Sequence, residues 1–160
     1  MELHLRAVLP ALILSGLGGF LAVIRFFGAT NLVRALDVPM TAISPLLTIL
    51  ALIGFLLFPI LAVAAGYFDG LNADLVQSRG SLLGLLLVAG LLGHVVGYVL
   101  GLVVLTVVPN FQPPSDVGGL LFPALQATIV GAVSIALAGV AGAGLGYLSQ
   151  TEVREALGAK

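Results

Sequence analysis

His94 is the one histidine that falls deep inside a long apolar run of this 160-residue sequence. An imidazole in hydrocarbon surroundings should be neutral, because charging it there is costly, and it then offers one hydrogen-bond donor and one acceptor. Such a group can contact a proton or a solute in a cavity, or it can tie two helices together. We favour the tie between helices; haem ligation would require a symmetric dimer that supplies His94 twice.

Other polar side chains reach a similar depth if each apolar run is centred in a bilayer. Two serines of the first and last runs then lie near the level of the histidine, and a tyrosine lies one helical turn further out, close to the level of a threonine. A glutamine in the outer third of the last run is costly if it faces lipid, so it should face protein or a vestibule. We therefore expect one polar cluster inside the bundle, made of His94, Tyr98, Ser134, Ser15, Gln126 and Thr128.

Several kinds of chemistry are excluded by what the sequence lacks beside this cluster. Every Asp and Glu lies outside the apolar runs, so no carboxylate can complete a Ser–His–Asp arrangement with His94. The sequence has no cysteine, which rules out disulfides, thiolate metal sites and cysteine nucleophiles. We therefore predict no catalytic residue, no cofactor and no metal site, and we expect the protein not to be an enzyme.

The composition predicts lipid rather than water around most of the chain. Hydrophobic residues make up 60% of the sequence and charged residues 8%, whereas soluble domains carry about 25% charged residues. The mean hydropathy is +1.23. Four apolar runs are each long enough to cross a bilayer as a helix, over residues 7–25, 43–67, 81–108 and 120–147. The sequence therefore predicts an all-α integral membrane protein, a four-helix bundle that forms a single domain over residues 1–160.

Two local features modify these helices. Residues 31–37 can form two turns of helix with one apolar side, too short to span, so we expect a short interfacial helix after the first span. Pro59 lies inside the second run and cannot donate a hydrogen bond to the Phe55 carbonyl, which predicts a kink there. We favour a static packing role for the kink, and a gating hinge is the alternative.

Small residues recur at every fourth position in the third and fourth runs. On a helix this spacing lines them along one face, where a neighbouring backbone can approach closely. We favour packing of these two runs on each other within one chain, because short loops favour sequential antiparallel neighbours. A dimer or larger assembly is the alternative. The predicted packing positions are Gly93, Gly97, Gly101, Ala138, Gly142 and Gly146.

Four crossings place both termini on one side of the membrane. Four of the six basic side chains lie on that side and two on the other, so the positive-inside rule favours cytoplasmic termini. We expect a multi-pass protein of the cell membrane, with a prokaryotic composition and with the lipid bilayer as its surroundings. Its candidate partners are a second copy of the chain or a larger membrane complex, and no nucleic acid.

The sequence favours a non-enzymatic function, as an accessory, scaffolding or oligomer-forming component of the membrane. The absence of buried carboxylates, the small loops and the rows of small residues support this interpretation. The alternative is a small-solute or ion transporter or channel in which His94 lies on a polar path. A cavity that reaches His94 would discriminate between the two.

Overall fold

The structure, a computed structural model, describes residues 5–28, 31, 33, 37, 39–71, 75–107 and 117–156. These residues form helices and their ends, with no strand among them. Two of the elements, η1 and η2, are π-helical turns, whose backbone hydrogen bonds span one residue more than those of an α-helix. The elements in chain order are α1 Leu5–Val23, η1 Ile24–Gly28, α3 Met40–Leu52, η2 Ile53–Leu57, α4 Phe58–Gly70, α5 Leu75–Thr106 and α6 Val117–Ala156.

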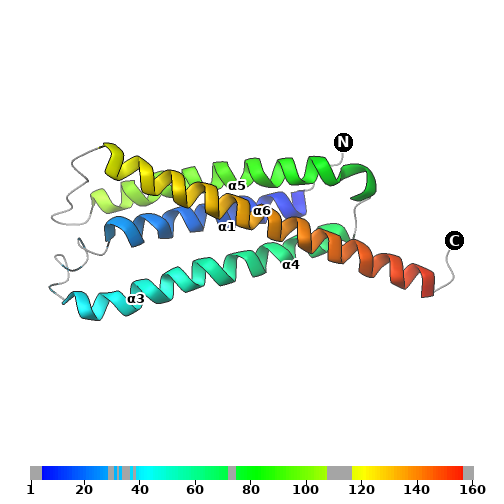
Figure 1. The fold of residues 1–160 in the computed structure, drawn as a ribbon, viewed down its shortest axis with the longest axis horizontal. Coiled ribbons are helices and arrows are strands. Elements are labelled where there is room, and N and C mark those ends of the chain that lie inside the picture. The colour runs from blue at the N-terminus through cyan, green and yellow to red at the C-terminus, as the bar shows by residue number, and fades with distance from the viewer. Residues whose placement is uncertain are drawn as a thin grey trace.

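Four helical stretches are long and apolar enough to cross a membrane: Ala7–Gly28, Thr41–Gly70, Gly80–Thr106 and Leu121–Val153. They pack together as a bundle, which confirms the predicted all-α membrane fold (Figure 1). α1 begins and α6 ends at one end of this bundle, here named the terminal end; η1 and the start of α3 lie at the far end.

Two expected boundaries differ or fall outside the described residues. The last helix continues beyond the predicted end at residue 147 to Ala156, because its final turns contain good helix formers such as Gln150, Glu152 and Glu155. Of the short helix expected over residues 31–37, Asn31 and Val33 are helical, and most of the remainder lies outside the described residues.

The four spans associate as two tight pairs, α1 with α5 and α4 with α6. In the first pair, a Cβ added at Gly97 would overlap the Gly16 carbonyl oxygen, so the two backbones touch directly. In the second pair, a Cβ at Gly142 would likewise overlap the Val63 carbonyl oxygen. Backbones that approach this closely gain dispersion contacts and weak Cα–H···O bonds that a side chain would prevent.

The predicted packing of the two small-residue rows on each other is therefore wrong. Gly93 and Gly97 face α1, and Gly142 and Gly146 face α4. The physical reason lies in the partner helices, because α1 carries its own glycines at the contact with α5, and α4 has Gly66 at the contact with α6. Two helix surfaces that both lack side chains can approach more closely than two surfaces of which only one does. α5 and α6 do touch, but less extensively than either pair.

The two π-helical turns occur where the second span and the end of the first are interrupted. η2 comes directly before the first turn of α4, in which Pro59 lies. Proline has no N–H for the usual bond to the carbonyl four residues earlier, so the backbone before it must adjust locally, and a π turn is one such adjustment. η1 ends the first span and contains Arg25.

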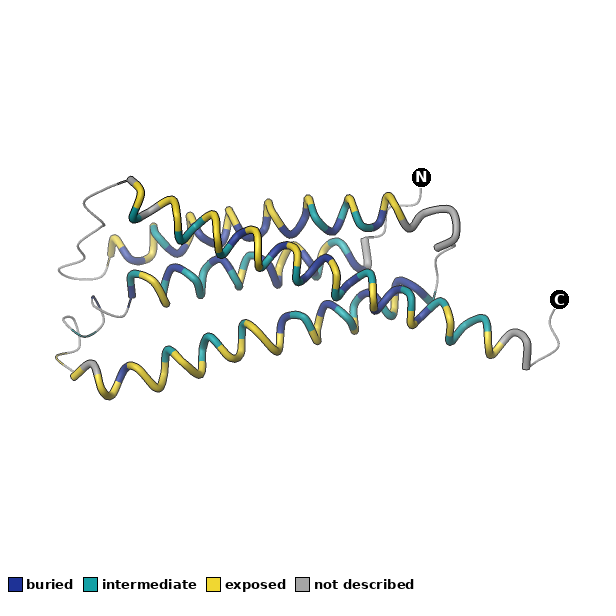
Figure 2. Tube along the Cα trace, viewed as in Figure 1, coloured by how far each residue is buried: buried dark blue, intermediate teal, exposed yellow. Residues whose placement is uncertain are grey.

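Packing is uneven along the bundle, as Figure 2 shows. The larger core cluster joins the terminal half of the four spans through small and branched side chains such as Ala11, Leu82, Leu86 and Ala136. By contrast, only 11% of the most apolar window of the second span is buried, against 33–39% in the other three. Most side chains of α3 and η2 are therefore turned to the surroundings, which in a membrane are lipid.

Candidate functional site

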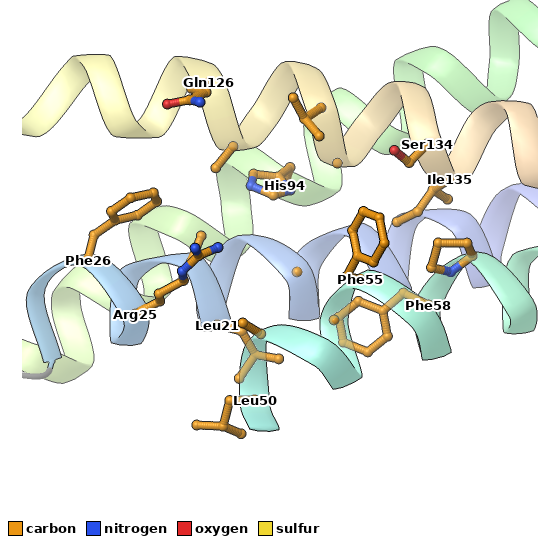
Figure 3. A pocket seen from close by; sticks show the side chains of 18 residues that line it. Leu21, Arg25, Phe26, Leu50, Phe55, Phe58, His94, Gln126, Ser134 and Ile135 are labelled. Carbon is orange, nitrogen blue, oxygen red and sulfur yellow. The ribbon is translucent and has the colours of Figure 1, made fainter. Parts of the chain in front are cut away.

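A cavity of about 250 Å³ lies between the two helix pairs, from mid-bundle toward the far end (Figure 3). α1 and η1 form one wall, α3, η2 and the first residues of α4 a second, and α6 a third. α5 contributes a single side chain to the lining, that of His94. The cavity is positioned by the packing described above, because α3 is less closely packed than α4 and leaves space beside α1 and α6.

His94 occupies the deepest polar position of this cavity. Its side chain is 3% exposed, and neither Nδ1 nor Nε2 has a hydrogen-bond partner among the described residues. A buried polar group without a partner costs about 1–3 kcal/mol of stability, so such groups are rare in proteins. The ring lines the cavity but both nitrogens are covered by neighbouring atoms, so a small turn of the ring would bring a nitrogen to a molecule bound there.

Two glycines place backbone, without a side chain, beside the Cε1–Nδ1 edge of the His94 ring. A Cβ added at Gly131 of α6 would lie 2.9 Å from both Cε1 and Nδ1. A Cβ at Gly18 of α1 would lie 3.7 Å from the same two atoms, at an ordinary contact distance. Both glycines line the cavity, and a side chain at Gly131 would press on the imidazole.

Three further polar side chains line the cavity: Arg25 from η1, and Gln126 and Ser134 from α6 (Figure 3). The Arg25 guanidinium carbon lies 5.8 Å from the centre of the Phe26 ring, a cation–π distance. Arg25 is the only formally charged residue of the lining, which contains no Asp or Glu. The remaining lining is mainly aliphatic and aromatic. The cavity therefore has mostly apolar walls with a few polar groups, as small-molecule sites do.

The structure divides the predicted six-residue polar cluster. His94, Ser134 and Gln126 line the same cavity, whereas Ser15, Tyr98 and Thr128 are not among its lining residues. Each of these other three is buried elsewhere in the bundle.

Ser15 and Tyr98 have packing roles of their own. The Ser15 hydroxyl donates a 2.5 Å hydrogen bond to the Gly90 carbonyl oxygen and so joins α1 to α5. Tyr98 belongs to a small core cluster with Val23 and Leu105 near the far end. Its ring lies edge-on to Phe27, with the ring centres 6.4 Å apart and the planes at 81°.

Sequence reasoning missed the residues of α1, η1 and η2 that complete the site. Arg25 is the last residue of the first predicted run, 7–25, and falls near the level of Gln126, a coincidence that could have suggested the pair. Gly18 and Gly131 carry no such signal, because apolar runs in this sequence contain many glycines. The contribution of Phe55 depends on η2, which the pattern of residues did not reveal.

The arrangement can bind a molecule but holds no recognisable set of reacting groups. His94 and Ser134 line the cavity without a carboxylate to orient the imidazole, and no group of three His, Cys, Asp or Glu residues in the described part of the chain could hold a metal ion. The sequence matches no family model, and no curated protein or solved structure shows significant similarity to it.

Proposed function

We propose that this membrane protein binds a small molecule in the cavity at His94 and takes part in its passage across the bilayer, without enzymatic chemistry. The observation that supports this most is the cavity ending on a buried imidazole whose two nitrogens have no partner among the described residues. A bound solute or water would satisfy those nitrogens and offset a cost of about 1–3 kcal/mol. A purely structural histidine tie would instead show a hydrogen bond between helices.

Passage also requires a way to open the other side of the cavity. The core cluster of the terminal half, including Leu86 and Ala136, closes the bundle there. The contacts within each helix pair are backbone to backbone, whereas the cavity lies between the pairs. Movement of one pair against the other would therefore cost less than separation of a pair. Rocking of packed helix groups around a central site is a known basis of alternating access.

A second candidate function is an accessory or oligomer-forming role, and the poor coverage of α3 favours it. Leu46, Ile49 and Leu52 are each more than half exposed on this helix. A second copy or a larger membrane complex could cover this surface, and so could lipid alone. We place either role in the cell membrane with cytoplasmic termini, on the distribution of basic residues.

Single-cysteine variants can test the binding role, because the sequence has no native cysteine. Ser134→Cys changes one atom of a cavity side chain, and Ser15→Cys changes the same atom of a buried serine outside the cavity. Maleimides react with the thiolate, which requires water at the thiol. In proteoliposomes, N-ethylmaleimide should label S134C at a rate well above that of S15C. Equal labelling rates for the two variants would overturn the proposed cavity.

The passage itself can be tested with a membrane-impermeant methanethiosulfonate reagent on the same S134C protein. In vesicles of known orientation, the reagent should modify Cys at position 134 from either side, although faster from the side of Arg25, where the cavity lies in this conformation. Modification from that side alone would overturn the proposed passage across the bilayer, but not the proposed binding in the cavity. The S15C protein, treated identically, measures the background from leaky vesicles.

A further inference from the structure

We propose that the molecule held at His94 is a single-chain amphiphile with a carboxylate head, which enters sideways from the bilayer with its head in the cavity and its tail in lipid. This proposal rests on the binding role proposed above and specifies its ligand. It is carried by the charge of the lining, the size of the cavity and the nature of its rim.

The charge of the lining selects an anion over a cation. Among the described residues, Arg25 is the only formally charged one that lines the cavity, and its guanidinium contacts the Phe26 ring. The guanidinium therefore has donors available for an oxygen ligand, and its planar fork matches a carboxylate. A cation would meet a like charge at Arg25 and no carboxylate in the lining. Hydroxyl and amide groups of Ser134 and Gln126 can donate further hydrogen bonds.

The size of the cavity limits how much of the ligand it can hold. Pockets that enclose a drug-sized molecule have volumes of about 300–1,000 Å³. The volume here is about 250 Å³, enough for a small head and the first carbons of a chain. The rest of a long acyl chain must therefore lie outside, and a bulky diacyl phospholipid headgroup fits less well than a carboxylate.

The rim of the cavity is suited to a tail that continues into lipid. Phe55 of η2 is 72% exposed and Val130 of α6 is 56% exposed, and both line the cavity. They belong to two elements that form different walls of the cavity. Within a membrane, exposed apolar side chains face acyl chains, so a ligand tail leaving between η2 and α6 would remain in hydrocarbon.

The head can then pair with the His94 nitrogens, which have no hydrogen-bond partner among the described residues, and with Arg25. A carboxylate oxygen can accept a hydrogen bond from the N–H of a neutral His94 while the head pairs with Arg25. Both ring nitrogens are covered by neighbouring atoms in this conformation, so the ring must turn toward the cavity to make this bond. The two residues thus have different roles: Arg25 selects a negatively charged head, and His94 determines how deeply the head enters the cavity.

Protection of the S134C thiol by defined lipids tests this assignment. Oleate, methyl oleate and phosphatidylglycerol are added at equal mole fractions to phosphatidylcholine proteoliposomes, at alkaline pH where the carboxylate is ionised. Oleate should slow maleimide labelling at a concentration about 10- to 150-fold lower than methyl oleate, because one charge-assisted bond is worth about 1.5–3 kcal/mol. In the S134C background, Arg25→Gln should raise the oleate concentration for half protection by the same factor, to that of the ester.

Two control variants separate specific protection from general effects. Gly144→Ala in the same background should leave protection unchanged, because a Cβ there meets nothing within 4 Å. Thr151→Cys, which lies outside the cavity near the end of α6, reports any effect of oleate on the membrane or the reagent. Labelling of T151C should not change with oleate.

The outcomes distinguish this proposal from the one on which it rests. Suppose that oleate and its ester protect equally, and that S134C is labelled in their absence. The assignment of a carboxylate head would then be overturned, but the proposed binding cavity would not. Protection by phosphatidylglycerol at concentrations as low as those of oleate would overturn the free carboxylate in favour of a phospholipid head. Failure to label S134C at all would overturn the cavity itself.

Discussion

The contacts within the helix pairs differ in kind from the contacts between the pairs. Within a pair, glycine allows one backbone to lie against another, as Gly97 lies against Gly16 and Gly142 against Val63. Between the pairs the contacts are less close, since a Cβ at Gly90 of α5 would lie 3.1 Å from the Ala132 Cα of α6, and the packing leaves a cavity of about 250 Å³ beside a histidine without a hydrogen-bond partner among the described residues. The closest packing and the cavity therefore occupy separate interfaces of one small bundle.

The difference has a physical basis in what each contact can tolerate. A backbone cannot change its rotamer, so a contact between two backbones admits a single fit. Side chains can repack, and a cavity between them can be filled by a ligand or water. We therefore expect substitutions in the two kinds of interface to have opposite consequences for stability and for binding.

The largest effect is expected from Gly97→Ile. A Cβ at this position would overlap the carbonyl oxygen of Gly16, and the obstacle is backbone on both sides. α1 and α5 must then separate, so we expect a loss of more than about 3 kcal/mol in the free energy of unfolding, or failure to fold. The measurement is unfolding by sodium dodecyl sulfate in detergent micelles, followed by circular dichroism.

Two milder variants keep this prediction testable if G97I cannot be purified. Gly97→Ala should still lower stability, because a single Cβ suffices for the overlap, whereas Gly144→Ala should not, because its Cβ meets nothing within 4 Å. Equal stability of G97A and G144A would show that the α1–α5 contact is looser than described. Contacts within this pair would then not differ in kind from those between the pairs.

An intermediate effect is expected from Gly142→Ala in the other pair. Its Cβ would overlap the Val63 carbonyl oxygen, so we expect a loss of about 2 kcal/mol in the free energy of unfolding. The double variant G97A/G142A should lose the sum of the two single values, because the two sites share no contacting residue. A coupling energy well above about 0.5 kcal/mol, measured by the same denaturation series, would contradict two independent pairs.

The fold could be predicted from the sequence to the level of four membrane helices, but not to the level of their neighbours. Length and hydropathy alone determine a crossing, since each run must bury its backbone polar groups in its own helix. Which helices touch depends on matching surfaces. The row containing Gly93 and Gly97 indicated a close contact, and the partner was found only where α1 presents Gly16 and Gly19 opposite.

The site could be predicted less well than the fold. His94 was identifiable because a histidine in an apolar run is rare and costly, and depth matching placed Ser134 near it. Depth does not fix the direction in which a side chain points around its helix axis, so Ser15, at the same level, turns to Gly90 instead. Arg25 and Phe55 come from π-helical turns, whose register a pattern based on 3.6 residues per turn does not describe.

The smallest effect on stability is expected from His94→Leu, with Ser15→Ala as its matched comparison. Ser15→Ala removes a hydrogen bond between α1 and α5 and should cost about 1 kcal/mol. His94→Leu removes no hydrogen bond to a described residue and replaces a buried polar ring by an apolar group, so the free energy of unfolding should stay the same or rise slightly.

The same two variants should show the reverse order in binding. With S134C as the reporter, H94L should abolish protection by oleate, whereas S15A should leave it unchanged, because Ser15 does not line the cavity. Suppose instead that H94L destabilised the bundle as much as S15A and left protection intact. His94 would then join helices, as Ser15 does. The interface between the pairs would differ from the contacts within each pair only in how closely it is packed.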